Sequence, residues 1–159
     1  MISATFTGAI ITKFEAALAA NVVLTAYIPM LMDTGGNAGS QSSVSVIRGL
    51  SLNEIAFSDI FKTIWKEIRV AVFCGITLAN FIKLMLLDRI NMTIALAVCL
   101  TLVLVVVFAK LVGCCLPLLA DKIGFDPAVM ASPMITTIVD ALSLLVYFTI
   151  ATHMIHLAS

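Results

Sequence analysis

The residues best suited to chemistry carry oxygen and lie in the last long apolar stretch. Thr136 and Thr137 precede Asp140 by one helical turn, and Ser143 follows it by one turn, so all four share a face. Pro133 lies on the same face and would leave a backbone carbonyl one turn earlier without its helical partner. Carboxylate, hydroxyl and carbonyl oxygens without sulfur or imidazole are the ligands of hard cations such as Mg²⁺ and Ca²⁺.

The expected depth of Asp140 in the membrane limits the kinds of cation site that it can form. At about 12 residues into its helix it lies about 18 Å deep, near the middle of a roughly 30 Å bilayer core. An ionised group there is costly and usually faces the protein interior or an ion path. One carboxylate suits a hydrated ion such as Mg²⁺, and a symmetric dimer would pair two copies of Asp140. The alternative is a carboxylate that is protonated or hydrogen-bonded to another helix.

A second polar cluster interrupts an apolar run at residues 29–48, PMLMDTGGNAGSQSSVSVIR. Its glycines permit tight turns and close helix approach. Asn37, Ser40 and Gln41 offer oxygen atoms without charge. Non-helical backbone at membrane depth is tolerated only where it is buried in protein or lines a water-filled cavity. The residue types leave two interpretations open, an interfacial loop or the lining of a pore.

The composition predicts an all-α integral membrane protein. The chain is 62% hydrophobic and 11% charged, whereas soluble domains are about half apolar and a quarter charged. The zero net charge argues against nucleic-acid binding, which needs a basic surface. The four cysteines show no zinc or disulfide spacing, and no nucleophile–base pair or cofactor motif indicates an enzyme.

Apolar runs near membrane length divide the chain into five expected transmembrane helices within a single domain, 1–159. Gly124 and Pro127 mark a turn before the last helix, and Asp126 is placed to cap that helix. A longer polar and amphipathic connection is expected between the second and third helices, and a tight turn at 87–91. The expected helices cover approximately 1–14, which is short or truncated, 16–32, 65–87, 92–119 and 128–157.

The orientation follows from the basic residues in the connections. Five of them flank the second-to-third and fourth-to-fifth connections and three lie on the other side, so the former connections are predicted to be cytoplasmic and the C-terminus outside. The five are Arg48, Lys62, Lys66, Arg69 and Lys122, and the three are Lys13, Lys83 and Arg89.

Two stretches resemble a known family. PMLMDTGGNAGSQ at 29–41, followed by VIRGL, is similar to the hallmark of the MgtE magnesium transporters, and GFDPAVMASPMITTIVDALSLLVYF at 124–148 resembles the last helix of that family. The resemblance implies a five-helix transmembrane domain that forms a homodimer with the pore between subunits. It also implies cytoplasmic N-terminal and CBS domains, which we do not expect here because the first expected helix begins at the start of the chain.

The resemblance also implies roles for individual residues. Asp140 would be the pore aspartate that holds hydrated Mg²⁺, with the backbone oxygen of Thr136 as a second contact. Asn37, with Gly36 and Gly39, would line or seal the pore near its cytoplasmic end. We expect the remaining positions of the two motifs to line the pore as well: Gln41, Pro133, Thr137 and Ser143.

The expected function is therefore a Mg²⁺-selective channel or transporter in the plasma membrane that moves hydrated ions down their electrochemical gradient. Its expected partners are a second copy of the chain, membrane lipid and divalent cations. One alternative keeps the pore but changes the ion to Mn²⁺, Co²⁺ or Zn²⁺. Another is a non-transporting membrane assembly subunit, in which Asp140 packs against a partner such as Lys110.

Overall fold

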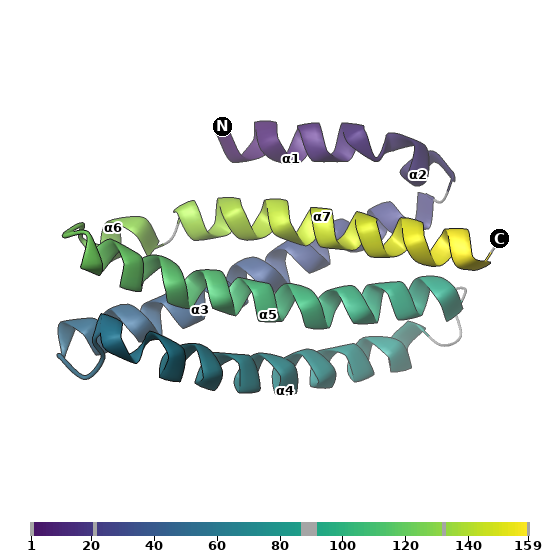
Figure 1. The fold of residues 1–159 in the computed structure, drawn as a ribbon. Helices are drawn as coiled ribbons and strands as arrows, with labels where there is room; N and C mark the ends of the chain where they lie inside the picture. Colours follow the sequence, from purple (N-terminus) through teal and green to yellow (C-terminus); the bar gives the residue numbers. More distant parts are fainter. Residues whose placement is uncertain (1, 21, 87–91, 132, 159) are drawn as a thin grey trace.

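The chain folds into helices throughout the part that the structure describes (Figure 1). The computed structural model describes residues 2–20, 22–86, 92–131 and 133–158. The all-α prediction is confirmed for these residues. In chain order the elements are α1 Ile2–Lys13, α2 Glu15–Ala20, the 3₁₀ helix η1 Val22–Tyr27, α3 Ile28–Ser51, the 3₁₀ helix η2 Phe57–Asp59, α4 Ile60–Leu86, α5 Met92–Lys122, α6 Pro127–Ala131 and α7 Pro133–Ala158.

The helix α5 is the centre of the bundle. It lies between α4 and α7, and α3 crosses it obliquely, while α1 packs mainly on α7 (Figure 1). The main apolar core forms where α3, α5 and α7 meet, and Leu31, Leu102 and Phe148 are fully buried in it. These buried side chains hold α3 against α7, which is the arrangement that positions the polar residues of both helices.

The segment from residue 16 to residue 51 differs from the sequence-based expectation. The expected helix 16–32 is wrong, because α2 ends at Ala20, η1 follows, and α3 runs continuously through the glycine-rich motif. The motif is neither an interfacial loop nor non-helical pore lining. A Cβ at Gly35 would lie 2.8 Å from Val105, and one at Gly39 would lie 3.0 Å from the carbonyl oxygen of Ala109. Close helix packing at these glycines therefore outweighs their low helix propensity.

The later helices begin and end near the predicted positions. The helix α4 starts five residues before the expected 65, and α5 extends to Lys122 rather than 119. The expected helix 128–157 is divided into α6 and α7, so Pro133 begins α7 instead of interrupting a helix. The predicted cap is confirmed, since Asp126 Oδ1 accepts a hydrogen bond of 2.9 Å from the backbone N–H of Ala128. The turn expected at 87–91 lies outside the described residues.

Two helices in the described part of the chain are long and apolar enough to cross a membrane by length and composition. They cover Met92–Lys122, whose most apolar 18 residues have a mean hydropathy of 2.9, and Pro133–Met154, whose most apolar 18 residues have a mean hydropathy of 1.9. The count of five transmembrane helices stays a prediction.

Candidate ion-binding groove

An open groove of about 660 Å³ lies between α3 and α7. It contains the predicted metal ligands Asp140 and Thr136 together with Asn37 and Gly36 from the glycine-rich motif. Segments about 100 residues apart in the sequence therefore meet in one place. We call this the α3–α7 groove, and its lining is Ile28, Pro29, Met32, Asp33, Gly36, Asn37, Ser40, Thr136 and Asp140.

The α7 wall of the groove carries the residues that the sequence singled out. Asp140 is half-buried, and Thr136 lies one turn before it on the same face. The Thr136 hydroxyl donates a hydrogen bond of 3.2 Å to the carbonyl oxygen of Pro133. This bond ties Thr136 to the first turn of α7, where Pro133 needs no intrahelical N–H bond. The α7 oxygens of the groove therefore lie on a regular helix that begins at Pro133.

The α3 wall adds a carboxylate that we did not predict. Asp33 lines the groove one helical turn before Asn37, and its Oδ2 accepts a hydrogen bond of 3.1 Å from Asn37 Nδ2. With its N–H₂ group turned to Asp33, Asn37 can present its amide oxygen to a cation. The signal in the sequence is the i, i+4 spacing of Asp33 and Asn37, which indicates a shared face only if the motif is helical.

The groove has the chemistry of a hydrated hard-cation site. Asp33 and Asp140 supply two carboxylates, Asn37 an amide oxygen, and Ser40 and Thr136 hydroxyl or carbonyl oxygens. Within the described ranges no cluster of three or more His, Cys, Asp or Glu side chains forms a closed metal site. Magnesium keeps several of its waters when one or two carboxylates bind it, so this open set of oxygens fits a hydrated Mg²⁺.

Five residues of the predicted pore lining lie outside the α3–α7 groove. Gly39 is buried against α5 and α7, and Ser143 is buried against Gly35. The Thr137 hydroxyl donates a hydrogen bond of 2.7 Å to the carbonyl oxygen of Pro133. Pro133 is exposed at the start of α7, and Gln41 lies on another side of α3. A role of these residues in a pore stays a prediction.

A second polar cluster joins α3, α4 and α5 away from Asp140. Lys110 Nζ lies 2.9 Å from Glu67 Oε2, and the Ser42 hydroxyl donates a hydrogen bond of 2.9 Å to the same oxygen. Taken as whole residues, Glu67 is 8% exposed and Ser42 is 1% exposed, so the cluster is largely buried. Lys110 therefore has Glu67 as its partner, so it does not pair with Asp140 as the example named in the assembly-subunit alternative would have it.

A hollow of about 290 Å³ lies beside this buried cluster and is lined by residues of α3, α4 and α5. Lys110 lines it together with Cys74 of α4 and Gln41 of α3. Asp33 and Asn37 line both this hollow and the α3–α7 groove. A single helix, α3, is thus the wall between two polar spaces.

Comparison with known proteins agrees with this arrangement. The protein-family model MgtE, described as a divalent cation transporter, matches residues 28–150, which run from the start of α3 into α7. The protein called magnesium transporter MgtE of Bacillus subtilis (strain 168) is 37% identical over 150 residues, which are 94% of this chain and 33% of that protein. The protein of the same name from Thermus thermophilus is 35% identical over 91% of this chain and 32% of its own length.

These relatives are named as transporters and not as enzymes, and the chain spans about a third of their length. The family match covers both walls of the α3–α7 groove. It leaves α1, α2 and η1 outside. The chain belongs to the MgtE family of divalent cation transporters.

Proposed function

We propose that this chain is the ion-conducting membrane part of a Mg²⁺ transporter, and that hydrated Mg²⁺ passes along the α3–α7 groove. The observation that carries the proposal is the meeting of Asp33 and Asp140 in one groove. Two carboxylates attract a divalent cation much more strongly than a monovalent one, because the attraction scales with the charge of the ion. The neighbouring amide and hydroxyl oxygens can hydrogen-bond to the waters that the ion retains.

The choice of Mg²⁺ among divalent cations rests on the ligand type and on the relatives. The groove is lined by carboxylate, amide and hydroxyl groups and by no Cys or His, whereas Zn²⁺ sites are commonly built from thiolate sulfur and imidazole nitrogen. The relatives are named magnesium transporters, while the family description speaks only of divalent cations. Competition of Mn²⁺, Co²⁺ and Zn²⁺ against Mg²⁺ for binding separates these ions, and we expect Mg²⁺ to be transported at its physiological concentration.

The openness of the groove supports a homodimer. A carboxylate that faces lipid costs several kcal/mol, whereas one that faces protein or water does not. A second copy placed on this face would cover Asp140 and bring two sets of groove oxygens around one axis. The ion path would then lie between the subunits, and each copy would supply Asp33 and Asp140 to it.

Driving force and orientation complete the proposal. Membrane potential supplies about 2.3 kcal/mol per elementary charge per 100 mV, so passive inward flow of a divalent cation needs no ATP. The turn between α3 and α4 and the turn between α5 and α6 lie at one end of the bundle, and the C-terminus lies at the other (Figure 1). We assign the end with the two turns to the cytoplasm, because the basic residues near these connections outnumber those at the other end.

The test replaces the α7 carboxylate. We expect Asp140→Asn and Asp140→Ala to abolish Mg²⁺ uptake, measured with a Mg²⁺-sensitive dye inside proteoliposomes and as growth of a Mg²⁺-starved strain. Asp121→Asn is the matched control, since Asp121 is exposed and does not line the groove. Full uptake by Asp140→Ala would overturn the proposed role of the groove. Absence of uptake by the unaltered chain in proteoliposomes would favour the assembly-subunit alternative.

A further inference from the structure

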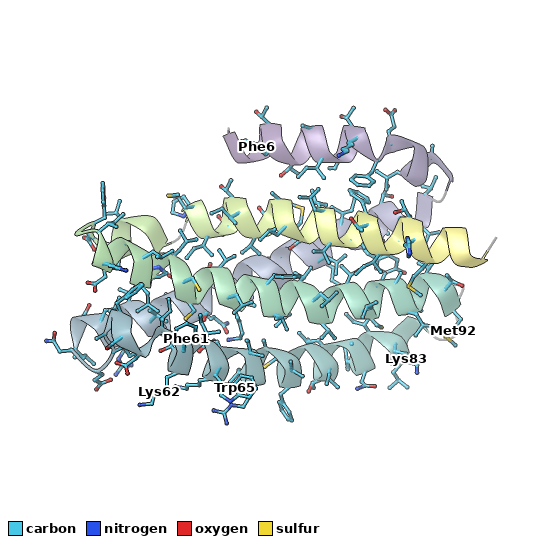
Figure 2. All side chains as sticks on the ribbon, viewed as in Figure 1. Phe6, Phe61, Lys62, Trp65, Lys83 and Met92 are labelled. Atoms are coloured by element: carbon cyan, nitrogen blue, oxygen red, sulfur yellow. The ribbon has the colours of Figure 1, made fainter. Side chains whose placement is uncertain are left out.

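The first turns of α4 carry basic and aromatic side chains on their outer surface. Phe61 is 83% exposed and Trp65 is 62% exposed, and Lys62 lies between them in the sequence. Figure 2 shows Lys62 and Trp65 on the side of α4 that faces away from α5, far from Lys83 at the other end of the helix. Exposed tryptophan beside lysine and arginine is typical of the level of lipid headgroups.

A small hollow lies on this surface. It has a volume of about 280 Å³ and is lined by Lys66, Arg69, Val70 and Phe73. The spacing of these residues along α4 places the two cations one turn nearer the helix start than the two apolar residues. Phe73 is 75% exposed, so its ring forms an open apolar wall. The hollow is therefore cationic at the end nearer the start of α4 and apolar at the end nearer the middle of that helix. A phospholipid headgroup and its acyl chain follow each other in the same order.

The two cations of the hollow are free to bind an anion. Glu67, which lies next to Lys66 in the sequence, already binds Lys110 and Ser42. In the ranges that the structure describes, no carboxylate forms an ion pair with Lys66 or Arg69. Like charges on one face of a helix repel, and a bound phosphate group removes that repulsion.

The acidic side chains closest to Lys66 and Arg69 line a different, neighbouring hollow. Glu54 and Asp59 line a neighbouring hollow of about 370 Å³, which Lys66 and Arg69 also reach, but Val70 and Phe73 do not. Asp59 Oδ2 already accepts a hydrogen bond of 3.2 Å from the backbone N–H of Ala56. The side of the cations that faces Val70 and Phe73 carries no acid.

We propose that this hollow binds an anionic phospholipid, with its phosphate on Lys66 and Arg69 and an acyl chain along Val70 and Phe73. Basic residues near a membrane surface contribute about 1 kcal/mol each toward anionic lipid, or about fivefold in binding constant. The proposal concerns α4 and requires neither ion flow nor the α3–α7 groove, so it can fail or succeed independently of the transport function.

Trp65 supplies the measurement, because it is the single tryptophan of the chain. The full chain is reconstituted into phosphatidylcholine vesicles in which a fixed fraction of lipid is replaced by phosphatidylglycerol or phosphatidylcholine with brominated acyl chains. Bromine quenches nearby tryptophan fluorescence. We expect brominated phosphatidylglycerol to quench Trp65 with a relative binding constant about five- to 25-fold above that of brominated phosphatidylcholine.

The double variant Lys66→Gln/Arg69→Gln should reduce this preference to a ratio near one. The matched control is Lys13→Gln/Lys83→Gln, which removes the same charge from exposed positions outside the hollow and should keep the preference. Circular dichroism and size-exclusion chromatography establish that each variant is folded. Equal quenching by the two lipids in the unaltered protein would overturn the proposal, as would an unchanged preference in the folded Lys66→Gln/Arg69→Gln variant.

Discussion

Lys110 of α5 and Glu67 of α4 form an ion pair of 2.9 Å between Nζ and Oε2, and the same carboxylate oxygen accepts a hydrogen bond from Ser42 of α3. Three helices thus converge on one atom. Both charged side chains are 11% exposed, so the bond competes with little water. The same helix α3 carries Asp33 and Asn37, so the hydrogen bond of Ser42 to Glu67 helps to hold the α3 wall of the α3–α7 groove in place.

Removal of one member of this buried pair should destabilise the bundle. Glu67→Gln leaves Lys110 charged without its partner, and breaking a buried pair in this way costs about 3–5 kcal/mol. We expect a clear fall in melting temperature of the purified protein in detergent, measured by circular dichroism. Ser42→Ala should lower it less, because it removes a hydrogen bond and leaves the ion pair in place.

A double replacement distinguishes a buried ion pair from a surface one. Glu67→Leu/Lys110→Met replaces both charges by apolar groups and should recover most of the lost stability, as buried pairs commonly do. If the losses in Glu67→Leu alone and Lys110→Met alone add up to the loss in the double variant, Lys110 and Glu67 are independent.

The contact of α3 with α5 depends on glycine at position 113. A Cβ at Gly113 would collide with the carbonyl oxygen of Gly39, and backbone atoms cannot move aside cheaply. We expect Gly113→Ala to cost about 1–3 kcal/mol of stability through overpacking, measured as a lower melting temperature. Gly8→Ala is the control, because among the described residues no atom outside the local backbone of α1 lies within 4 Å of a Cβ at Gly8. Equal melting temperatures of the two variants would contradict the close contact.

Asp33 should strengthen cation binding together with Asp140. Asp33→Asn removes one charge from the groove but keeps an oxygen that can accept the hydrogen bond of Asn37. We expect Mg²⁺ to bind about tenfold more weakly, a loss of about 1.4 kcal/mol, in isothermal titration calorimetry. Asp121→Asn should leave the affinity unchanged, and an unchanged affinity in Asp33→Asn would exclude Asp33 from the ion site.

A buried tyrosine of α7 holds the 3₁₀ helix η1 by a hydrogen bond. Tyr147 Oη donates a hydrogen bond of 2.9 Å to the carbonyl oxygen of Leu24, and both residues are 0% exposed. Tyr147→Phe leaves that carbonyl without this donor, so we expect a loss of about 1–3 kcal/mol and increased proteolysis near η1. Tyr27→Phe should have little effect, because Tyr27 is only partly buried and lacks a hydroxyl hydrogen bond in the described part of the chain. Equal stability of the two variants would contradict this role of Tyr147.

The α7 half of the candidate site could be predicted from the sequence. A carboxylate deep in an apolar run is costly enough that its position indicates a protein-lined space, and helical spacing then places Thr136 beside Asp140. The structure brings both residues into the groove. It does not bring in Thr137 or Ser143, because a helical face spans about 100° and only part of it meets α3 across open space.

The α3 half was harder to predict because local and tertiary preferences disagree there. Glycine, asparagine and serine favour turns, so the motif has the composition of a loop. The close packing of Gly35 and Gly39 on α5 and α7 explains why the motif is helical. The sequence alone does not show that these helices lie beside the motif. In an irregular segment the i, i+4 spacing of Asp33 and Asn37 carries no information, so Asp33 becomes a candidate ligand only when the segment is known to be helical.

The ion pair of Lys110 and Glu67 also has an electrical consequence. Lys110 lines the hollow that Asp33 and Asn37 share with the groove, and an unpaired ammonium there would raise the local potential against an approaching cation. Glu67 cancels this charge at a distance of 2.9 Å, so the far field of Asp33 and Asp140 remains negative. The carboxylate of Glu67 would thereby keep an electrostatic barrier out of the proposed ion path without lining the α3–α7 groove itself.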